Sequence, residues 1–209
     1  MSVLRLATTN SGKHREIARM IVGELGHQAA LLEIVDLSSL PGYGPPVEDG
    51  DTYRANARLK ARAAADGRTA VLADDSGIEV AALGGAPGIH AARWAQAPSG
   101  APLDGAGLNR ALLARMADVA DRRAAMVSTV VLAIPGQEEE VGQGRVSGRL
   151  AHDQRGSGGF GYDAVFILDD GRRLSEVAGE EKDRVGHRGQ AVRAVVPALV
   201  RWLAALGRA

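Results

Sequence analysis

The sequence predicts an α/β fold in which helices flank a mixed β-sheet. Three observations support this. Strand-like and helix-like segments are interspersed without strict alternation, no internal repeat or low-complexity linker interrupts them, and hydrophobic residues make up 45% of the 209 residues. A chain of this length and hydrophobicity can bury a sizeable core. We therefore expect residues 1–209 to form a single domain with two lobes around a central cleft.

The first half of the chain predicts a strand, a polar loop and a helix. The strand is VLRLAT at 3–8, and the helix carries Ile17, Ile21 and Leu25 on one apolar face. Asn10 or Ser11 is suited to cap that helix. The elements expected next along the chain are a strand at 31–37, a Pro/Gly loop at 40–50, a helix at 52–65, and strands at 69–73 and 78–83.

The second half predicts a helix at 104–116, a pair of strands at 126–134 and 141–146, and a strand at 162–168. Apolar residues from Val192 to Leu203 then recur at helical spacing. Because Pro197 lies inside that pattern, the last helix is expected either to be kinked or to begin later than the pattern suggests.

Composition narrows the class of protein. Lys plus Arg and Asp plus Glu both number 25, which argues against a dedicated nucleic-acid binder. The absence of cysteine excludes disulfides, thiolate catalysis and cysteine-based zinc sites. The start MSVLRLATTN lacks the pattern of a signal peptide, and no uninterrupted apolar run approaches the ~20 residues of a membrane span. We expect a soluble cytoplasmic protein that binds neither nucleic acid nor membrane.

The segment GSGGFGYD satisfies G-x-G-x-x-G at Gly156, Gly158 and Gly161. The dinucleotide-binding pattern requires a helix after the glycines, whereas YDAVFIL here favours a strand. Two interpretations remain balanced. The glycines form a simple turn, or they bring the backbone close to a flat ligand that stacks on Phe160.

A polar loop before the first helix, TTNSGKHRE, is the better candidate for phosphate binding. A helix start offers N–H groups to anions, and Lys13 adds a charge. It is not a P-loop, because Ala7 and His14 stand where that motif needs Gly and Ser or Thr. Taken alone, an ordinary capped helix start explains the loop better.

Adjacent carboxylates follow a predicted strand in ADDSG, at Asp74 and Asp75. Neighbouring strand residues point to opposite faces, so one of the two is expected to enter a given cleft. In a chain without cysteine, an oxygen-rich site favours Mg²⁺, and Glu48 is a candidate second ligand. A common β-turn is the alternative explanation.

Basic residues gather in two further places. Asn56 and Lys60 are spaced i, i+4 and share a helix face. Near the C-terminus, Lys182, His187 and Arg188 are close in sequence. Each group is either a solvated surface or a set of donors for phosphate and base.

Together these segments resemble the inosine/xanthosine triphosphate pyrophosphatases, a Ham1-like family. The resemblance covers nearly the whole chain and rests on LATTNSGKHREI, ANARLKA, ADDSGIEV, LGGAPGIHAARW, GSGGFGYDAVF, and EEK followed by HRGQA, in that order. It implies the Ham1-like two-lobed fold, a homodimer, and Mg²⁺-dependent hydrolysis of ITP, dITP and XTP to the monophosphate and pyrophosphate.

The resemblance also implies roles for individual residues. Asp75 would be the catalytic acid/base and, with Glu48, the metal ligand. The implied substrate-binding residues on the phosphate side are Thr8, Thr9, Asn10, Ser11, Gly12, Lys13, Asn56 and Lys60. Those around the base are Phe160, Gly161, Tyr162, Asp163, Lys182, His187 and Arg188, and Ser76 would also contact substrate. An N–H of His187 or Arg188 would donate a hydrogen bond to the 6-oxo group of hypoxanthine, whereas the amino group of adenine would leave that donor mispaired, at a cost of ~1–3 kcal/mol.

Two rival functions stay open. One is a related pyrophosphatase for modified pyrimidine or methylated nucleotides, and the other is a non-catalytic nucleotide-binding protein. The carboxylate pair beside the lysines argues against the second, since binding alone does not need it.

Overall fold

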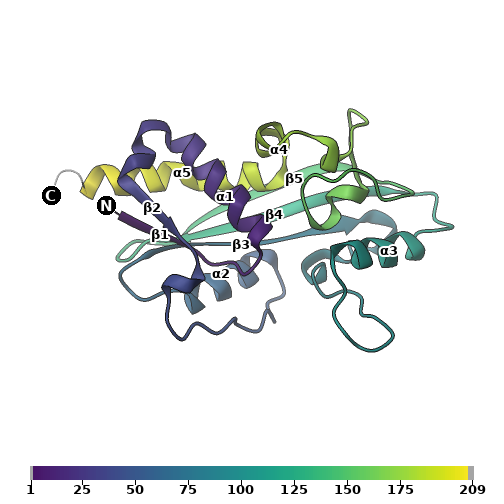
Figure 1. The fold of residues 1–209 in the computed structure, drawn as a ribbon, viewed down its shortest axis with the longest axis horizontal. Coiled ribbons are helices and arrows are strands. Elements are labelled where there is room, and N and C mark those ends of the chain that lie inside the picture. The colour runs from purple at the N-terminus through teal and green to yellow at the C-terminus, as the bar shows by residue number, and fades with distance from the viewer. Residues whose placement is uncertain (1, 207–209) are drawn as a thin grey trace. The chain divides into compact units, whose positions relative to one another are not determined.

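A six-stranded mixed sheet organises the computed structural model, which describes residues 2–206 (Figure 1). The strand order is β2-β1-β3-β4-β5-β6. Strand β1 runs parallel to β2 and β3, and β5 runs antiparallel to β6. The strands are β1 (Ser2–Leu6), β2 (Leu32–Val35), β3 (Ala70–Val80), β4 (Arg123–Ala133), β5 (Glu140–Leu150) and β6 (Phe166–Leu168). The predicted mixed sheet with flanking helices is confirmed.

The chain divides into two compact units. Unit 1 comprises residues 1–75, 128–144 and 187–209, and unit 2 comprises residues 76–127 and 145–186. The long strands β3, β4 and β5 each contribute one part to either unit. The central cleft expected from the sequence stays a prediction.

In unit 1, helices cover both faces of the sheet (Figure 1). Helices α1 (Ser11–Leu25) and α5 (His187–Leu206) pack on one face against a core that includes Leu4 and Leu72. Helix α2 (Tyr53–Ala63) packs on the other face against Val71 and Ala73. Because strand side chains alternate between faces, residue parity along β3 decides which helices each side chain meets.

Unit 2 has its own core. It is formed by apolar residues of β3, β4, β5 and β6 with helix α3 (Gly105–Arg115), including Leu112, Met126 and Phe166. The short helix α4 (Gly179–Val185) completes the unit.

The structure corrects three expectations about elements. The strands expected at 69–73 and 78–83 are one strand, β3, because Ser76 and Gly77 extend the strand where a turn was expected. The strand expected at 162–168 begins only at Phe166, after a 3₁₀ helix at Gly161–Val165. Of the two alternatives for the last helix, the late start is wrong, because α5 already begins at His187 and contains Pro197, and the kink stays a prediction.

Among residues 2–206, α5 is the one helix long and apolar enough to cross a membrane. Within its most apolar stretch 44% is buried inside the protein, where Val195, Leu199 and Leu203 pack into the unit 1 core. This is the packing of a core helix.

Candidate functional site

Asn10 caps helix α1 and holds the loop that leads into it. Its side-chain Oδ1 accepts hydrogen bonds from the backbone N–H of Gly12, at 2.9 Å, and of Lys13, at 3.1 Å. Asn10 N–H in turn donates to the hydroxyl of Thr8, at 3.1 Å. The expected cap is therefore present, and two N–H groups that a helix start leaves without helical partners are taken by the cap itself.

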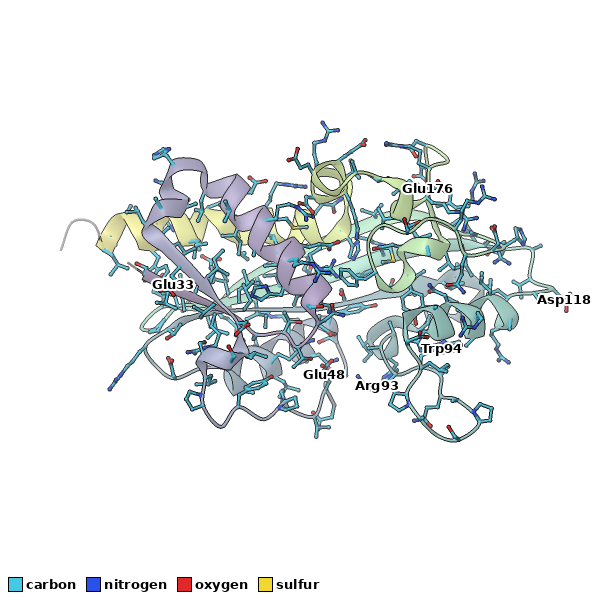
Figure 2. All side chains as sticks on the ribbon, in the orientation of Figure 1. Glu33, Glu48, Arg93, Trp94, Asp118 and Glu176 are labelled. Atoms are coloured by element: carbon cyan, nitrogen blue, oxygen red, sulfur yellow. The ribbon has the colours of Figure 1, made fainter. Side chains whose placement is uncertain are left out.

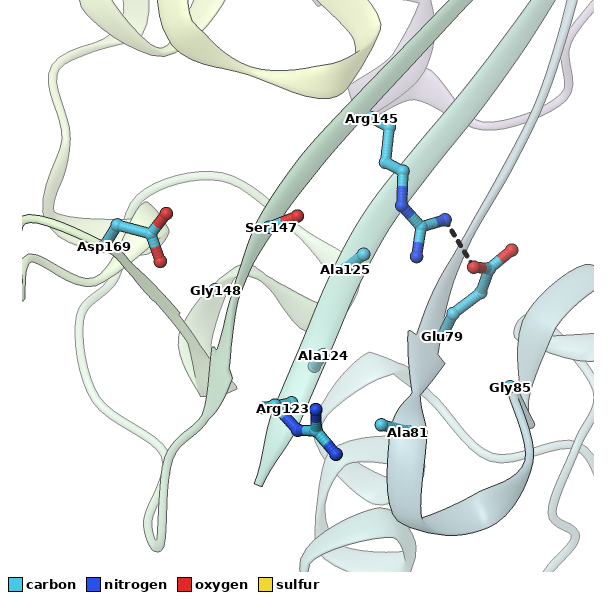
Figure 3. Close-up of a pocket in the computed structure, with 10 residues that line it drawn as sticks. All are labelled: Glu79, Ala81, Gly85, Arg123, Ala124, Ala125, Arg145, Ser147, Gly148 and Asp169. Atoms are coloured by element: carbon cyan, nitrogen blue, oxygen red, sulfur yellow. Dashed lines mark hydrogen bonds and ion pairs between the residues drawn. The ribbon is translucent and has the colours of Figure 1, made fainter. Parts of the chain in front are cut away.

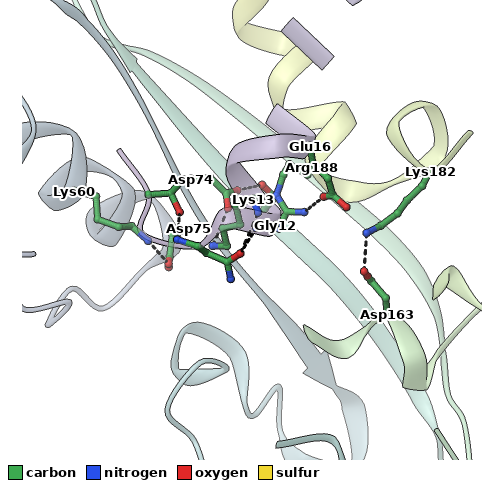
Figure 4. A network of polar contacts seen from close by, with 12 residues as sticks. Gly12, Lys13, Glu16, Lys60, Asp74, Asp75, Asp163, Lys182 and Arg188 are labelled. Carbon is green, nitrogen blue, oxygen red and sulfur yellow. Dashed lines mark hydrogen bonds and ion pairs between the residues drawn. The ribbon is translucent and has the colours of Figure 1, made fainter. Parts of the chain in front are cut away.

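Asp74 lies on the face of β3 that meets α1 and α5. Its Oδ2 lies 2.8 Å from Lys13 Nζ and 3.5 Å from Arg188 Nε, and Ser128 donates a short hydrogen bond to its Oδ1 (Figure 4). Arg188 also pairs with Glu16, Nη1 to Oε2 at 2.5 Å. Two cations and two carboxylates thus form a buried network in unit 1.

Burial and charge act against each other in this network. Burial alone would raise the pKa of Asp74, but the charges of Lys13 and Arg188 hold that pKa well below its usual range. For Lys13, burial is the dominant cause and lowers its pKa, while Asp74 opposes the change. Asp74 is therefore firmly ionised and serves as the counter-charge of its two cationic neighbours.

Asp75 lies on the opposite face of β3, with α2. Lys60 Nζ donates to its Oδ1 at 2.7 Å, and Asn56 Nδ2 lies 3.4 Å from its Oδ2. Burial raises the pKa of Asp75 above its usual range, although Lys60 opposes this. The two adjacent acids thus point to opposite faces, as alternation predicts, and their pKa values shift in opposite directions.

Glu48 approaches the same position from the loop before α2 (labelled in Figure 2). Its Oε2 lies 3.5 Å from Lys60 Nζ, so one ammonium contacts the carboxylates of both Glu48 and Asp75. No group of three or more potential metal-ligating side chains occurs within residues 2–206. The carboxylates of Glu48 and Asp75, which both contact the Lys60 ammonium, nevertheless suit Mg²⁺. Proteins bind this ion through one or two carboxylates together with substrate phosphates.

In unit 2, the segment around Phe160 is fixed by Asp163 and Lys182. Asp163 Oδ2 accepts from the backbone N–H of Phe160 at 2.8 Å and from Lys182 Nζ at 2.6 Å. Lys182 Nζ also lies 5.1 Å from the centroid of the Phe160 ring, within cation–π distance. Tyr162 is buried, and its hydroxyl donates to the carbonyl of Ala91 at 2.6 Å.

Gly159 has no room for a side chain. Its φ is +71°, and a Cβ there would lie 2.1 Å from Asp163 Oδ2. Gly159 therefore lets the chain turn closely around the Asp163–Lys182 pair, whereas Gly156 and Gly158 lie against Ser175. The glycines are followed by a 3₁₀ helix at Gly161–Val165, where a dinucleotide motif needs the start of an α-helix.

The structure brings many of the predicted residues together within each unit. In unit 1, Lys13 and Arg188 both contact Asp74. Asn56 and Lys60 both contact Asp75, and Lys60 also contacts Glu48. In unit 2, Phe160, Asp163 and Lys182 are in contact. His187 is buried at the start of α5, Thr9 and Ser11 are exposed beside the cap, Gly161 is exposed at the start of its 3₁₀ helix, and Ser76 is half-buried in β3.

Sequence reasoning missed three contacts. Glu16, which pairs with Arg188, is three residues beyond Lys13 on α1, and that spacing was the available signal. Ser128, which donates to Asp74, is 54 residues away on β4, and nothing in the sequence marked it. Asn109 of α3 donates to the carbonyl of Gly161 at 2.9 Å, again without a sequence signal.

Unit 2 also contains a hollow of about 380 Å³ on the sheet (Figure 3). Charged residues line it, among them Glu79 and Arg145, which form an ion pair at 2.5 Å, and Arg123 and Asp169. None of the predicted site residues lines this hollow.

The fold and the contacts of Asp74 and Asp75 in unit 1 define an α/β protein with a site that combines carboxylates and cationic side chains. The model of the Ham1 family matches residues 4–198, and the chain belongs to this family. The chain is 47% identical over 193 residues to a protein from Symbiobacterium thermophilum named dITP/XTP pyrophosphatase, covering 90% of each chain.

Solved structures of related proteins have the same fold as this chain. A Ham1 protein from Coxiella burnetii superposes with a TM-score of 0.80 at 30% identity, covering 96% of this chain and all of that one. A dITP/XTP pyrophosphatase from Mycobacterium abscessus gives a TM-score of 0.70 at 38% identity, covering 94% of this chain and 99% of that one.

Proposed function

We propose that this protein hydrolyses the deaminated purine nucleoside triphosphates ITP, dITP and XTP to the monophosphate and pyrophosphate. The observation that carries the proposal is the pair of adjacent acids in unit 1, one paired with Lys13 and Arg188 and the other with Lys60. Relatives named dITP/XTP pyrophosphatase support the choice of substrate.

Unit 1 supplies the phosphate chemistry in this proposal. Lys13 and Lys60 present ammonium groups that stabilise negative charge on the phosphate oxygens, and the capped start of α1 adds backbone dipoles. Asp74 holds the Lys13 ammonium in place at 2.8 Å and opposes the lowering of the Lys13 pKa that burial causes. A phosphate oxygen can thus replace water around the ammonium at little reorganisation cost, because the cation is already held in place.

Asp75 is the proposed general base. It accepts the proton of the water that attacks the α-phosphorus, and the bond to the bridging oxygen breaks with pyrophosphate as the leaving group. Its raised pKa suits this role, since a base works best when its pKa approaches the working pH. Glu48 and Asp75 are the residues that would hold Mg²⁺, which supplies charge neutralisation on the phosphates and orientation of the water.

We propose that residues of unit 2 contribute to base recognition, where Phe160 offers a ring face and Asp163 and Lys182 offer an acceptor and a donor. The 6-oxo group of hypoxanthine or xanthine requires a donor. Lys182 is such a group, and His187 and Arg188 remain candidates by resemblance. An adenine amino group would leave the donor unpaired, at a cost of ~1–3 kcal/mol.

A substrate panel tests the function. Purified protein is incubated with ITP, dITP, XTP, GTP, ATP and a modified pyrimidine triphosphate, with and without Mg²⁺, and pyrophosphate and orthophosphate are measured separately. We expect pyrophosphate from the first three only, and only with Mg²⁺. Orthophosphate would place the cleavage elsewhere, turnover of the pyrimidine would favour the rival pyrophosphatase, and binding without turnover would favour a nucleotide-binding protein.

The remaining expectations belong to the same proposal. We expect a cytoplasmic homodimer that needs no nucleic acid or membrane. Mass photometry of the purified chain tests the dimer, with a single species at the monomer mass as the contrary result.

A further inference from the structure

The side chain of Asn56 joins a loop to the end of a strand in unit 1. Its Oδ1 accepts the backbone N–H of Gly50 at 2.9 Å, and its Nδ2 lies 3.4 Å from Asp75 Oδ2. The residue is 0% exposed. Both ends of the amide therefore contact protein groups, and the side chain has no surface with which to touch a substrate.

Gly50 fits this contact because it has no side chain. A Cβ at Gly50 would lie 2.7 Å from Asn56 Oδ1 and 2.7 Å from Ala55 Cβ. Neither neighbour can withdraw easily, because both are held on helix α2. The loop backbone at this point is thus fixed against the first turn of α2.

The position of Glu48 depends on that contact. Glu48 precedes Gly50 by two residues, in a segment without regular secondary structure, and its carboxylate lies 3.5 Å from Lys60 Nζ. Lys60 is one turn beyond Asn56 on α2 and donates to Asp75. Asn56 therefore holds the loop of Glu48 while it contacts Asp75, and Lys60 contacts both carboxylates from the same helix face.

We propose that Asn56, with Gly50, is a positioning residue that sets the separation of the Glu48 and Asp75 carboxylates for a divalent cation, and that it does not bind substrate. The inference rests on the metal assignment made under the proposed function. Groups that orient metal ligands through hydrogen bonds typically change metal affinity 10–100-fold when they are replaced.

The test compares Asn56→Ala, Gly50→Ala and the control Arg58→Ala with wild-type protein. Arg58 also lies on α2 but pairs with Glu139, so its replacement perturbs the helix without touching the Gly50–Asn56–Asp75 contacts. Mn²⁺ binding to the nucleotide-free protein is followed by electron paramagnetic resonance. The Mg²⁺ dependence of ITP hydrolysis, and KM for ITP at saturating Mg²⁺, are measured on the same samples.

We expect Asn56→Ala and Gly50→Ala to bind Mn²⁺ at least 10-fold more weakly, and Arg58→Ala to bind it as wild type does. Excess Mg²⁺ should return KM for ITP to within about twofold of wild type. Unchanged Mn²⁺ affinity in Asn56→Ala, a KM that stays raised at saturating Mg²⁺, or no Mn²⁺ binding by wild type would each overturn the proposal.

Failure of the proposed role of Asn56 can be distinguished from failure of the proposed function. A wild-type protein that binds Mn²⁺ but does not hydrolyse ITP contradicts the proposed function, while the Mn²⁺ comparison still decides the role of Asn56. If Asn56→Ala does not fold, Gly50→Ala tests the same contact from the loop side.

Discussion

Replacing each of the two adjacent acids with asparagine should change the stability of the protein in different directions. Asp74→Asn removes a fully buried negative charge from between Lys13 and Arg188. Asp75→Asn instead removes a carboxylate whose charged form burial disfavours. We expect the first variant to be strongly destabilised, and the second to be at least as stable as wild type while losing turnover.

The magnitude for Asp74 follows from its contacts. Its side chain is 0% exposed, and its Oδ2 lies 2.8 Å from Lys13 Nζ. Removing one partner of a buried ion pair leaves an uncompensated charge and costs about 3–5 kcal/mol. For a chain of this length that corresponds to a fall in melting temperature of roughly 6–20 °C.

The pH dependence of the difference can be stated with its sign. The pKa of Asp74 is lower in the folded than in the unfolded protein, so its stabilisation is complete above the unfolded pKa and is lost as pH falls towards the folded pKa. The difference in unfolding free energy between wild type and Asp74→Asn should be constant from pH 6 to 8 and should narrow below about pH 4.

Urea unfolding at several pH values, with ITP turnover measured beside it, provides the assay. Asp66→Asn is a control outside the site, because Asp66 pairs with Arg5 at 3.0 Å but is itself 28% exposed. It should lose less stability than Asp74→Asn and keep its KM for ITP. A loss below about 1 kcal/mol for Asp74→Asn would refute the buried-network argument, and an active Asp75→Asn would refute the assignment of the base.

Three further predictions concern unit 2 and ITP kinetics. Phe160→Ala should raise KM for ITP roughly 5- to 150-fold, because stacking on an aromatic ring contributes about 1–3 kcal/mol per base, and an unchanged KM would exclude stacking. Asn109→Ala should raise KM and alter the ITP-to-GTP ratio of kcat/KM at nearly constant kcat, since it frees the Gly161 carbonyl; an unaltered ratio would speak against a positioning role. Gly159→Ala should weaken ITP binding at least tenfold through its clash with Asp163, and wild-type affinity would show that the segment relaxes without loss.

Local rules predicted the parts of the site in unit 1 that depend on one element at a time. Alternation along β3 correctly placed Asp74 and Asp75 on opposite faces, and the polar residue before α1 was correctly expected as a cap. Helical spacing placed Asn56 and Lys60 on one face, which the structure confirms through their shared partner Asp75. These contacts involve residues whose relative positions are set by strand and helix geometry alone.

Such local rules could not predict contacts between residues that are far apart in the sequence. Ser128 reaches Asp74 only because β4 lies beside β3, and sheet order is not encoded in a local pattern. The same limit applies to Asn109 and Gly161, 52 residues apart. The 3₁₀ helix at Gly161–Val165 was expected as a strand because YDAVFIL is rich in β-forming residues, and the hydrogen bond between Asp163 and Phe160 N–H overrides that preference.

The arrangement of the two acids also shows how a buried carboxylate with a raised pKa can be tolerated. Asp75 is buried with a raised pKa, which by itself disfavours folding at neutral pH. Its neighbour Asp74 has the opposite shift, so it stabilises the fold from the other face of the same strand. Asp74 and Asp75 are neighbours in β3, so the buried contacts of Asp74 with Lys13 and Arg188 also fix the backbone position of Asp75. Lys60 of α2 then contacts the Asp75 carboxylate. Under the proposed function, the acid that stabilises β3 and the acid that serves as the base are therefore adjacent but distinct residues.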